Sequence, residues 1–367
     1  MHVVHVSASG FRNLAPLDLE LPEAGAVFLG PNGHGKTNLL ELLYYPVLFR
    51  SVRGARDLGL IGFETPAFHL ALTLIDAERA TRRIECGFAR EGRRKRVAVD
   101  GAEQPRLLDA LGGWLAVAFL PTDVSLVMGG AAERRHFLDR VLALTSREYL
   151  IALRRYRSAL EQRNAALRQQ QSDAARAFEG PLAECGAVVL RHRLDWVSAL
   201  QGRLAELCAE LGEPLPVELE YRGRGEELQD AEAWAAQLHD ARARDLARGV
   251  TTVGPHRDDL LLRLGRAALR DVGSTGQHRT VAIALKLAER ETFARATSSE
   301  PALLLDDVFA ELDRSRQDAL AAILSAGPAR QVFVTAPRKD ELPPSLDLPV
   351  FGIREGRVSG STGGRSG

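Results

Sequence analysis

A glycine-rich stretch near the start of the chain has the residue types and spacing of a phosphate-binding loop. Residues 30–37, GPNGHGKT, satisfy the pattern GxxxxGK[ST], with the apolar run AVFL before them and the leucine-rich run NLLELLYY after them. Between a strand and a helix, such glycines let backbone N–H groups turn toward phosphates, and the helix N-terminus adds partial positive charge. Lys36 would then reach the β- and γ-phosphates, and Thr37 would offer a hydroxyl to Mg²⁺. The alternative is a chance glycine turn.

Two carboxylates that follow an apolar run could complete this site. In PALLLDDV, Asp306 and Asp307 come directly after residues 303–305, which predict a buried strand. Alone, the two residues could equally be turn or cap residues. Together with the phosphate loop, Asp306 is expected to coordinate Mg²⁺ and Asp307 to polarise an attacking water as general base. With Lys36, they are the candidate catalytic residues.

A third motif, STGQ, lies just upstream of that strand. Ser274, Gly276 and Gln277 precede a helical pattern, so a serine N-cap with a glycine turn is the plainest interpretation. A hydroxyl and backbone N–H groups at a helix start can also bind an anion. One chain has little need of a second phosphate site for the same nucleotide, so a second site would suit the nucleotide of another subunit.

The elements that must position these motifs alternate along the chain. Residues 1–120 are strand-rich: 17–21 and 68–74 alternate at period two, and 85–101 predict a hairpin that turns at 91–92. From 251 onward the sequence predicts strands at 259–264, 266–272, 301–308 and 331–336, and helices after Ser274 and at 317–324.

Between these two parts the period becomes helical. A stripe from Tyr149 to Leu167 and a second from Leu182 to Leu211 predict two amphipathic helices, and a third helix is expected from an N-cap at Asp230 to Gly249. If the first two have about 30 residues each, they form a hairpin arm on the order of 45 Å long. Four arginines are expected to lie off the first stripe: Arg154, Arg155, Arg157 and Arg163.

These patterns predict an α/β head interrupted by a helical insertion. The expected head comprises 1–131 and 250–359, the helical arm 132–249, and a small, polar, disordered tail 360–367. The 367 residues carry no net charge and no apolar run near the length of a membrane span. We therefore expect a soluble, cytoplasmic protein without a membrane partner, and the three widely spaced cysteines suggest neither zinc nor disulfides.

The order of the motifs resembles that of ATP-binding-cassette (ABC) ATPases of the SMC and Rad50 type, and more closely the RecF family. Besides the phosphate loop, STGQ and LLLDD, four further segments look like RecF segments: FRNL (11–14), RRHFLDRVL (134–142), LEQRNAALR (160–168) and GPHRDDL (254–260). The resemblance spans nearly the whole chain.

The resemblance implies an ABC-type, Rad50/SMC head-like P-loop ATPase domain with an inserted α-helical arm. Ser274, Gly276 and Gln277 resemble the signature motif that caps the γ-phosphate of the opposing subunit, and 311–313 resemble a loop lining the dimer interface. The residues expected to hold ATP are Arg12, Gly30, Asn32, Gly33, Gly35, Lys36, Thr37 and Asn38.

Two departures from transporter ATPases predict slow hydrolysis. Asp307 replaces the usual glutamate, which shortens its reach by one methylene, and Thr335 stands where a switch histidine is expected. A glutamine lid is not evident, and PTDV near Asp123 is only a candidate for that position.

DNA binding must rest on local clusters, because the net charge is zero. Each cluster could be a solvated face, yet together they could bind phosphates without sequence preference and in a salt-sensitive way. In GPHRDD, residues 254–259, a turn held by ion pairs is favoured over a catalytic site. The basic clusters are Arg50, Arg53 and Arg56; Arg93, Arg94, Lys95 and Arg96; and Arg154, Arg155 and Arg157.

What the RecF resemblance implies for function is an ATP-gated DNA switch. ATP would join two heads, the homodimer would grip single-stranded gaps or junctions with duplex, and a weak, DNA-stimulated ATPase would release it. The family serves RecA loading with RecR and RecO, replication restart and the SOS response to DNA damage. The alternatives are a chromosome-organising ATPase, whose arm should be longer or carry a CxxC hook, and a transporter ATPase subunit, which the insertion and the missing histidine disfavour.

Overall fold

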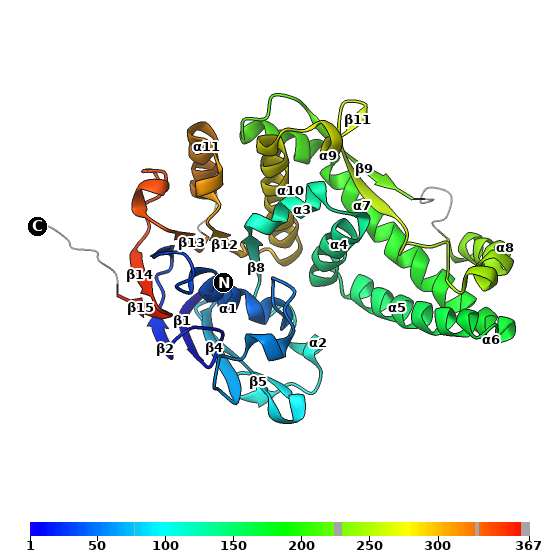
Figure 1. Ribbon diagram of the computed structural model, residues 1–367, viewed down its shortest axis with the longest axis horizontal. Coiled ribbons are helices and arrows are strands. Elements are labelled where there is room, and N and C mark those ends of the chain that lie inside the picture. Colours follow the sequence, from blue (N-terminus) through cyan, green and yellow to red (C-terminus); the bar gives the residue numbers. More distant parts are fainter. Residues whose placement is uncertain (77, 224–229, 327–329, 361–367) are drawn as a thin grey trace, which may run out of the picture. The chain divides into compact units, whose positions relative to one another are not determined.

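The protein is described by a computed structural model that covers residues 1–76, 78–223, 230–326 and 330–360 (Figure 1). The expected disordered tail, 360–367, lies outside the described residues apart from Gly360. The chain forms two compact units: unit 1 comprises 1–122 and 289–367, and unit 2 comprises 123–288.

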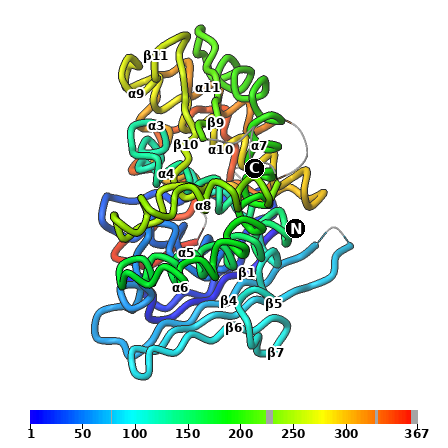
Figure 2. The backbone as a smooth tube through the Cα atoms, turned by 90° about the vertical axis from the view of Figure 1, so that its right-hand side faces the viewer, coloured from blue at the N-terminus to red at the C-terminus, as the bar shows by residue number. Residues whose placement is uncertain are grey.

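Unit 1 contains an antiparallel sheet built by the first part of the chain. Its strand order is β2-β1-β4-β5-β6-β7, and β1, β4, β5 and β6 lie side by side in Figure 2. The strands expected at 17–21 and 68–74 and the hairpin at 85–101 are confirmed. The bounds are β1 His2–Ser9, β2 Leu17–Glu20, β4 Ala67–Ile75, β5 Thr81–Ala89, β6 Lys95–Val99 and β7 Ala102–Glu103.

A second, mainly parallel sheet carries the candidate site. Its order is β15-β14-β3-β13-β12-β8, and every pair except β14 with β15 is parallel. Parallel strands end at one edge of a sheet, so the carboxyl ends of β3 and β12 place the phosphate loop and Asp306 at a common edge. The bounds are β3 Gly25–Leu29, β8 Ala116–Phe119, β12 Ala302–Asp306, β13 Val332–Ala336, β14 Val350–Arg354 and β15 Arg357–Ser359.

Helix α1 (Lys36–Leu48) follows the phosphate loop and contacts β12, β8 and β13. It is buried on nearly all sides, because leucine and tyrosine occupy consecutive positions rather than one stripe. The other helices and turns wholly within unit 1 are η1 Asp57–Leu60, η2 Glu91–Arg93, α2 Leu107–Ala110, η4 Phe309–Glu311, α11 Arg314–Ser325 and η5 Lys339–Glu341.

Unit 2 is mainly helical, as the stripes predicted. The helix expected from Asp230 to Gly249 is confirmed: the Asp230 side chain accepts from Ala233 N, and Gly249 ends the helix with φ 64°. Helix α10 runs on across the boundary of the two units. The bounds are α3 Ser125–Met128, α4 Ala131–Thr145, α5 Arg147–Arg168, α6 Ser172–Ala177, α7 Glu179–Glu210, α8 Ala231–Arg248, α9 Leu269–Val272 and α10 Thr275–Thr297; η3 (Pro121–Val124) precedes them.

The arm differs from its expected dimensions and limits. Helix α5 has 22 residues, about 33 Å, because a turn after Arg168 ends it, whereas α7 has 32 residues. Strand β9 (Val217–Arg222) pairs with β10 (Asp259–Leu264), which ties residues beyond the expected arm boundary at 249 to the helical part of the chain. Unit 2 spans 123–288, whereas the arm was expected at 132–249.

Two local predictions in unit 2 are wrong. Residues 266–272 were expected to form one strand, but only β11 (Ala267–Ala268) is extended, and α9 follows. Arg163 was expected off the apolar stripe, yet its side chain is fully buried. Arg163 comes seven residues after Tyr156, so it lies on the same face of α5 and an acidic partner allows its burial.

Candidate nucleotide-binding site

The backbone of the phosphate loop leaves the first turn of α1 open. Gly33 and Gly35 have φ of 82° and 108°, in the left-handed region that glycine tolerates. Gly35 is the N-cap, so no side chain caps the helix, and the first turn holds no acidic residue. These N–H groups and the helix dipole are therefore available to an anion.

Neighbouring segments hold the loop in place. The backbone N–H of Gly356 donates to His34 O, and that of Glu355 donates to His34 Nδ1, each at 3.0 Å. The Asn13 amide donates to Gly33 O at 3.1 Å. A Cβ on Gly30 would lie 2.0 Å from a carbonyl oxygen of β14, so only glycine fits there. The β14–β15 turn and the segment after β1 thus fix the loop's shape.

Lys36 lies in the mouth of the loop with only 4% of its surface exposed. Its ammonium donates to Gly30 O at 2.7 Å and to Asn32 Oδ1 at 3.0 Å. Among the described residues, no carboxylate forms an ion pair with it. Because its partners are neutral oxygen atoms, phosphate oxygens could replace them and form stronger, charge-assisted hydrogen bonds.

Thr37 and Asp306, 269 positions apart, meet at the edge of the sheet. The Thr37 hydroxyl donates to Asp306 Oδ2 at 2.8 Å, and Thr335 Oγ1 donates to Asp306 Oδ1 at 2.8 Å. A hydroxyl and a carboxylate this close fit Mg²⁺, which takes oxygen ligands, few of them from protein. Among the described residues, no group of three or more His, Cys, Asp or Glu is arranged to hold a metal ion.

Asp307 is held beside Asp306 in a strained backbone conformation, with φ of 50°. Its N–H donates to Thr335 Oγ1 at 3.0 Å. Burial, and then the charge of Asp306, raise the pKa of Asp307 above its ordinary value, and the Lys36 ammonium opposes that rise. A higher pKa makes this carboxylate a stronger base, as the role of general base requires. Thr335, which stands where transporter ATPases have the switch histidine, therefore forms hydrogen bonds with both Asp306 and Asp307.

Arg12 and Asn38 lie beside the loop in a network that sequence reasoning missed. Arg12 forms a two-pronged ion pair with Glu41 of α1, with Nε to Oε2 at 2.9 Å and Nη2 to Oε1 at 3.1 Å. Glu41 is 1% exposed and also accepts from Ser51. Asn38 donates to Asn13 Oδ1 at 2.7 Å. The missed signal is one glutamate inside the apolar run LLELLYY, which needs a buried partner.

In unit 2, the STGQ motif forms a capping box at the start of α10. Gln277 N donates to Ser274 Oγ at 3.2 Å, and Ser274 N donates to Gln277 Oε1 at 2.8 Å. Gln277 also donates to Glu213 at 3.1 Å, and Gly276 O accepts from Thr280. The structure thus confirms that Ser274 caps the helix. Ser274 is also exposed, so it remains accessible to another molecule.

The two basic clusters of unit 1 come together around Lys95. Its ammonium pairs with Asp57 at 2.8 Å and donates to Phe49 O, so this side chain, 17% exposed, is committed to the fold. Arg53 donates to Asn38 Oδ1 at 3.1 Å and stays partly exposed. The exposed members of the predicted DNA set are Arg53, Arg56, Arg93, Arg94 and Arg96, and Arg94 pairs with the exposed Glu103 at 3.7 Å.

The GPHRDD segment is a turn, as expected, but its ion pairs are not local. Arg257 N donates to Gly254 O, while Asp259 pairs with Arg134 of α4 at 2.8 Å. His256 Nδ1 lies 2.6 Å from the Tyr156 hydroxyl, and Asp258 accepts from Tyr221. These contacts reach three distant elements, so the segment joins parts of unit 2 that the sequence does not show to be neighbours.

Known proteins match the chain over nearly its full length, although no family model does. It is similar to the "DNA replication and repair protein RecF" of Anaeromyxobacter sp. (strain Fw109-5), 38% identical over 372 residues, and to that of Streptomyces avermitilis, 36% identical over 377 residues. Each match covers 98% of this chain and 99% of the relative.

Solved structures give the same result. A "recombination mediator protein RecF-ATP in RecFOR pathway" is 29% identical with a TM-score of 0.89, covering 98% of this chain and 97% of that one. An Smc head domain from Pyrococcus furiosus, bound to the C-terminal domain of ScpA, is 15% identical with a TM-score of 0.57; the match covers 98% and 95% of the two chains and shows the fold alone. The expected α/β, ABC-type fold related to SMC heads is therefore confirmed.

Proposed function

The chain belongs to the RecF family, and from that premise we propose that it is an ATP-gated DNA-binding switch in DNA repair and recombination. The observation that carries the proposal is the contact between Thr37 and Asp306 at 2.8 Å, beside an uncapped helix start and a lysine that no described acid pairs with. This arrangement suits the triphosphate and magnesium of a nucleotide such as ATP, with which the similar RecF structure was solved.

In the proposed site, Lys36 binds the β- and γ-phosphates in place of Gly30 O and Asn32 Oδ1. Thr37 and Asp306 would hold Mg²⁺, directly or through water, and the metal would supply positive charge beside the phosphates. Asp307 orients the attacking water and accepts its proton, and Thr335 holds Asp307 in place by accepting a hydrogen bond from its backbone N–H. Because Asp307 is one methylene shorter than glutamate, hydrolysis is slow and ATP acts mainly as a latch.

The second half of the site is proposed to come from another copy of the chain. Ser274, Gly276 and Gln277 would cap the γ-phosphate bound by the opposing subunit, so that ATP joins two heads. Support comes from the exposure of Ser274 and from its place at the start of α10, a 23-residue helix whose N-terminus favours an anion.

The ATP-bound homodimer is proposed to hold DNA through phosphate contacts. The exposed arginines Arg53, Arg56, Arg93 and Arg96 offer positive charge on unit 1. Arg94 and Lys95 contribute less, because Glu103 and Asp57 pair with them. The DNA would be single-stranded or duplex, bound without sequence preference, and gaps with strand junctions are the proposed sites.

The proposed cellular role rests on membership of the RecF family and on the RecFOR pathway in which the similar solved protein acts. The chain would act in the cytoplasm with RecR and RecO, promote loading of RecA, and contribute to replication restart and SOS induction. Among the described helices, none combines the length and apolar character needed to cross a membrane.

Sedimentation with ATP, Mg²⁺ and DNA tests the switch. The wild type should dimerise with ATP, and its DNA affinity should rise when the dimer forms. Lys36→Met should lose ATP binding, by roughly a hundredfold or more, because a charge-assisted contact to two phosphates is removed. Ser274→Arg should keep ATP binding and lose dimerisation.

Ser158→Arg is a matched control, because Ser158 is an exposed serine on α5 outside the STGQ motif. It should dimerise like the wild type. A wild type that stays monomeric with ATP, or a DNA affinity that ignores nucleotide, would rule out the gate. A dimer formed normally by Ser274→Arg would show that the STGQ motif does not contact ATP across the interface.

A further inference from the structure

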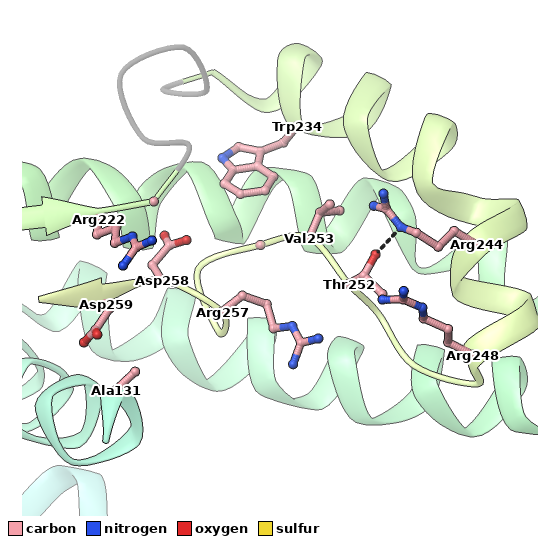
Figure 3. A pocket seen from close by; sticks show the side chains of 12 residues that line it. Ala131, Arg222, Trp234, Arg244, Arg248, Thr252, Val253, Arg257, Asp258 and Asp259 are labelled. Atoms are coloured by element: carbon pink, nitrogen blue, oxygen red, sulfur yellow. Dashed lines mark hydrogen bonds between the residues drawn. The ribbon is translucent and has the colours of Figure 1, made fainter. Parts of the chain in front are cut away.

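A groove of about 680 Å³ lies in unit 2 and shares no residue with the nucleotide site described above (Figure 3). It is formed by the end of β9, helix α8 and the segment 252–259 that contains GPHRDD. Four exposed arginines line it: Arg222, Arg244, Arg248 and Arg257.

These arginines are not neutralised by neighbouring acids. Arg244 donates to the Thr252 hydroxyl at 2.9 Å, a neutral partner, and within the described part of the chain Arg248 and Arg257 form no ion pair. A neighbouring pocket of the same unit shows the contrast: there Arg134 pairs with Asp259 and Arg263 with Glu220. Like charges four residues apart on α8, at 244 and 248, repel each other, so the groove favours an anion.

Trp234 gives the groove a second, independent feature. The indole is 3% exposed, and its Nε1 has no hydrogen-bond partner among the described residues. Figure 3 shows the indole nitrogen turned toward the side of the groove where Arg222 and Asp258 lie. A buried N–H without a partner costs free energy, which an acceptor on a bound molecule would recover.

The groove does not suit a nucleic-acid strand. Trp234 is buried and offers no face on which a base could stack. Arg244, Arg248 and Arg257 lie on one side of the groove, but Asp258 and Asp259 line the other (Figure 3). Asp259 is paired with Arg134 at 2.8 Å, so Asp258 is the carboxylate that a bound strand would meet. A phosphodiester chain carries a charge at every nucleotide and would be repelled there, whereas a peptide can place carboxylates against the arginines and a neutral residue against Asp258.

We propose that this groove docks an acidic segment of a partner protein, whose carboxylates bind Arg244, Arg248 and Arg257 while an uncharged residue faces Asp258. Arginine suits this task, because its planar fork binds carboxylates through two parallel hydrogen bonds. The indole N–H of Trp234 donates to a backbone or side-chain oxygen of the same segment. The site is independent of ATP and of the DNA contacts proposed for unit 1.

Fluorescence anisotropy with a labelled peptide of four glutamates followed by two leucines tests the groove. Its affinity for the full chain should fall roughly tenfold or more in the double variant Arg248→Glu, Arg257→Glu. Trp234→Phe keeps the ring and removes the donor, so it should weaken binding severalfold. The peptide with glutamines in place of the glutamates should bind no variant.

The control is Arg154→Glu, Arg155→Glu, which makes the same charge change on exposed residues of α5. It should bind the acidic peptide like the wild type, and ATP binding should be unchanged in all variants. The proposal fails if the control weakens peptide binding as much as the groove variant does. It also fails if the groove variant loses affinity for a 20-nucleotide single strand or duplex and keeps its peptide affinity, because the groove would then bind nucleic acid.

Discussion

In unit 1 the buried ammonium of Lys36 contacts neutral oxygen atoms, whereas in unit 2 the buried guanidinium of Arg163 contacts carboxylates. Arg163 Nη1 lies 2.7 Å from Asp245, and Nη2 lies 3.3 Å from Glu179, which Arg242 also binds. Although burial raises the pKa of Glu179, hydrogen bonds from Arg242 and Arg163 lower it overall. These two buried cations therefore differ in their partners: neutral oxygens around Lys36 and carboxylates around Arg163.

This difference in partners distinguishes a buried cation that can bind a ligand from one that only stabilises the fold. A cation held only by neutral oxygens can exchange them for phosphate without leaving an acid unpaired. If a cation that is paired with buried acids moves away, those acids remain charged and buried without a partner, which costs free energy. Buried charge alone thus says little about function, and the partner of the charge decides its role.

The largest effect is expected when the buried ion pair of Arg163 with Asp245 in unit 2 is broken. Arg163→Met should lower the free energy of unfolding by about 3–5 kcal/mol, because Asp245, fully buried, would lose its cation. Urea unfolding at neutral pH measures this. Arg191→Met is the control: its partner Glu148 is 59% exposed, so the loss should stay below about 1 kcal/mol. Equal losses in the two variants would contradict the comparison.

A somewhat smaller effect concerns pH and the GPHRDD turn. Burial lowers the pKa of His256 from 6.5 to about 4, and Arg257 adds to the shift. The unfolded chain takes up this proton near pH 6.5 and the folded chain does not, so the stabilisation is complete above 6.5 and declines as pH falls toward 4. The expected loss is on the order of 3 kcal/mol.

Urea unfolding from pH 8 to 4 checks the histidine. His256→Gln should remove this part of the pH dependence and leave the dependence above 6.5 parallel to that of the wild type. An unchanged slope between 6.5 and 4 in the variant would show that other groups cause the acid loss.

A moderate effect is expected at the two carboxylates of unit 1. Thr335→Val removes the hydroxyl that accepts from Asp307 N and donates to Asp306, and it should cost about 1–3 kcal/mol of stability. Thr335→Ser keeps the hydroxyl and should cost less. If urea midpoints of the serine and valine variants coincide, the hydroxyl does not hold these carboxylates.

The smallest effect on stability is expected at the phosphate loop itself. Lys36→Met should change the free energy of unfolding by less than about 1 kcal/mol, because no described buried acid loses its partner. Calorimetry without nucleotide measures this, and ATP binding to the same variant should be lost. If Lys36→Met lost about as much stability as Arg163→Met, the lysine would also be needed to stabilise the fold, which would contradict the comparison.

Much of the fold followed from pattern. The phosphate loop, the strand before Asp306 and the helices of unit 2 were predicted because each depends on residues close together in the chain. Arg163 was misplaced, because a charged residue on an apolar stripe is buried only when a partner from another helix lies opposite it. The pairing of β9 with β10 was missed for the same reason, since it joins residues about 40 positions apart.

The sequence by itself determined which side chains the proposed nucleotide site contains, because glycine spacing, Lys36, Thr37 and a strand ending in Asp306 are local features. Only the tertiary structure decided which charges are free to bind and which are held. Glu41 pairs with Arg12 and Asp57 pairs with Lys95, whereas no described acid forms an ion pair with Arg248 or Arg257. The physical reason is that the free energy of a charge depends on the groups brought within a few ångströms of it, and folding alone sets those neighbours.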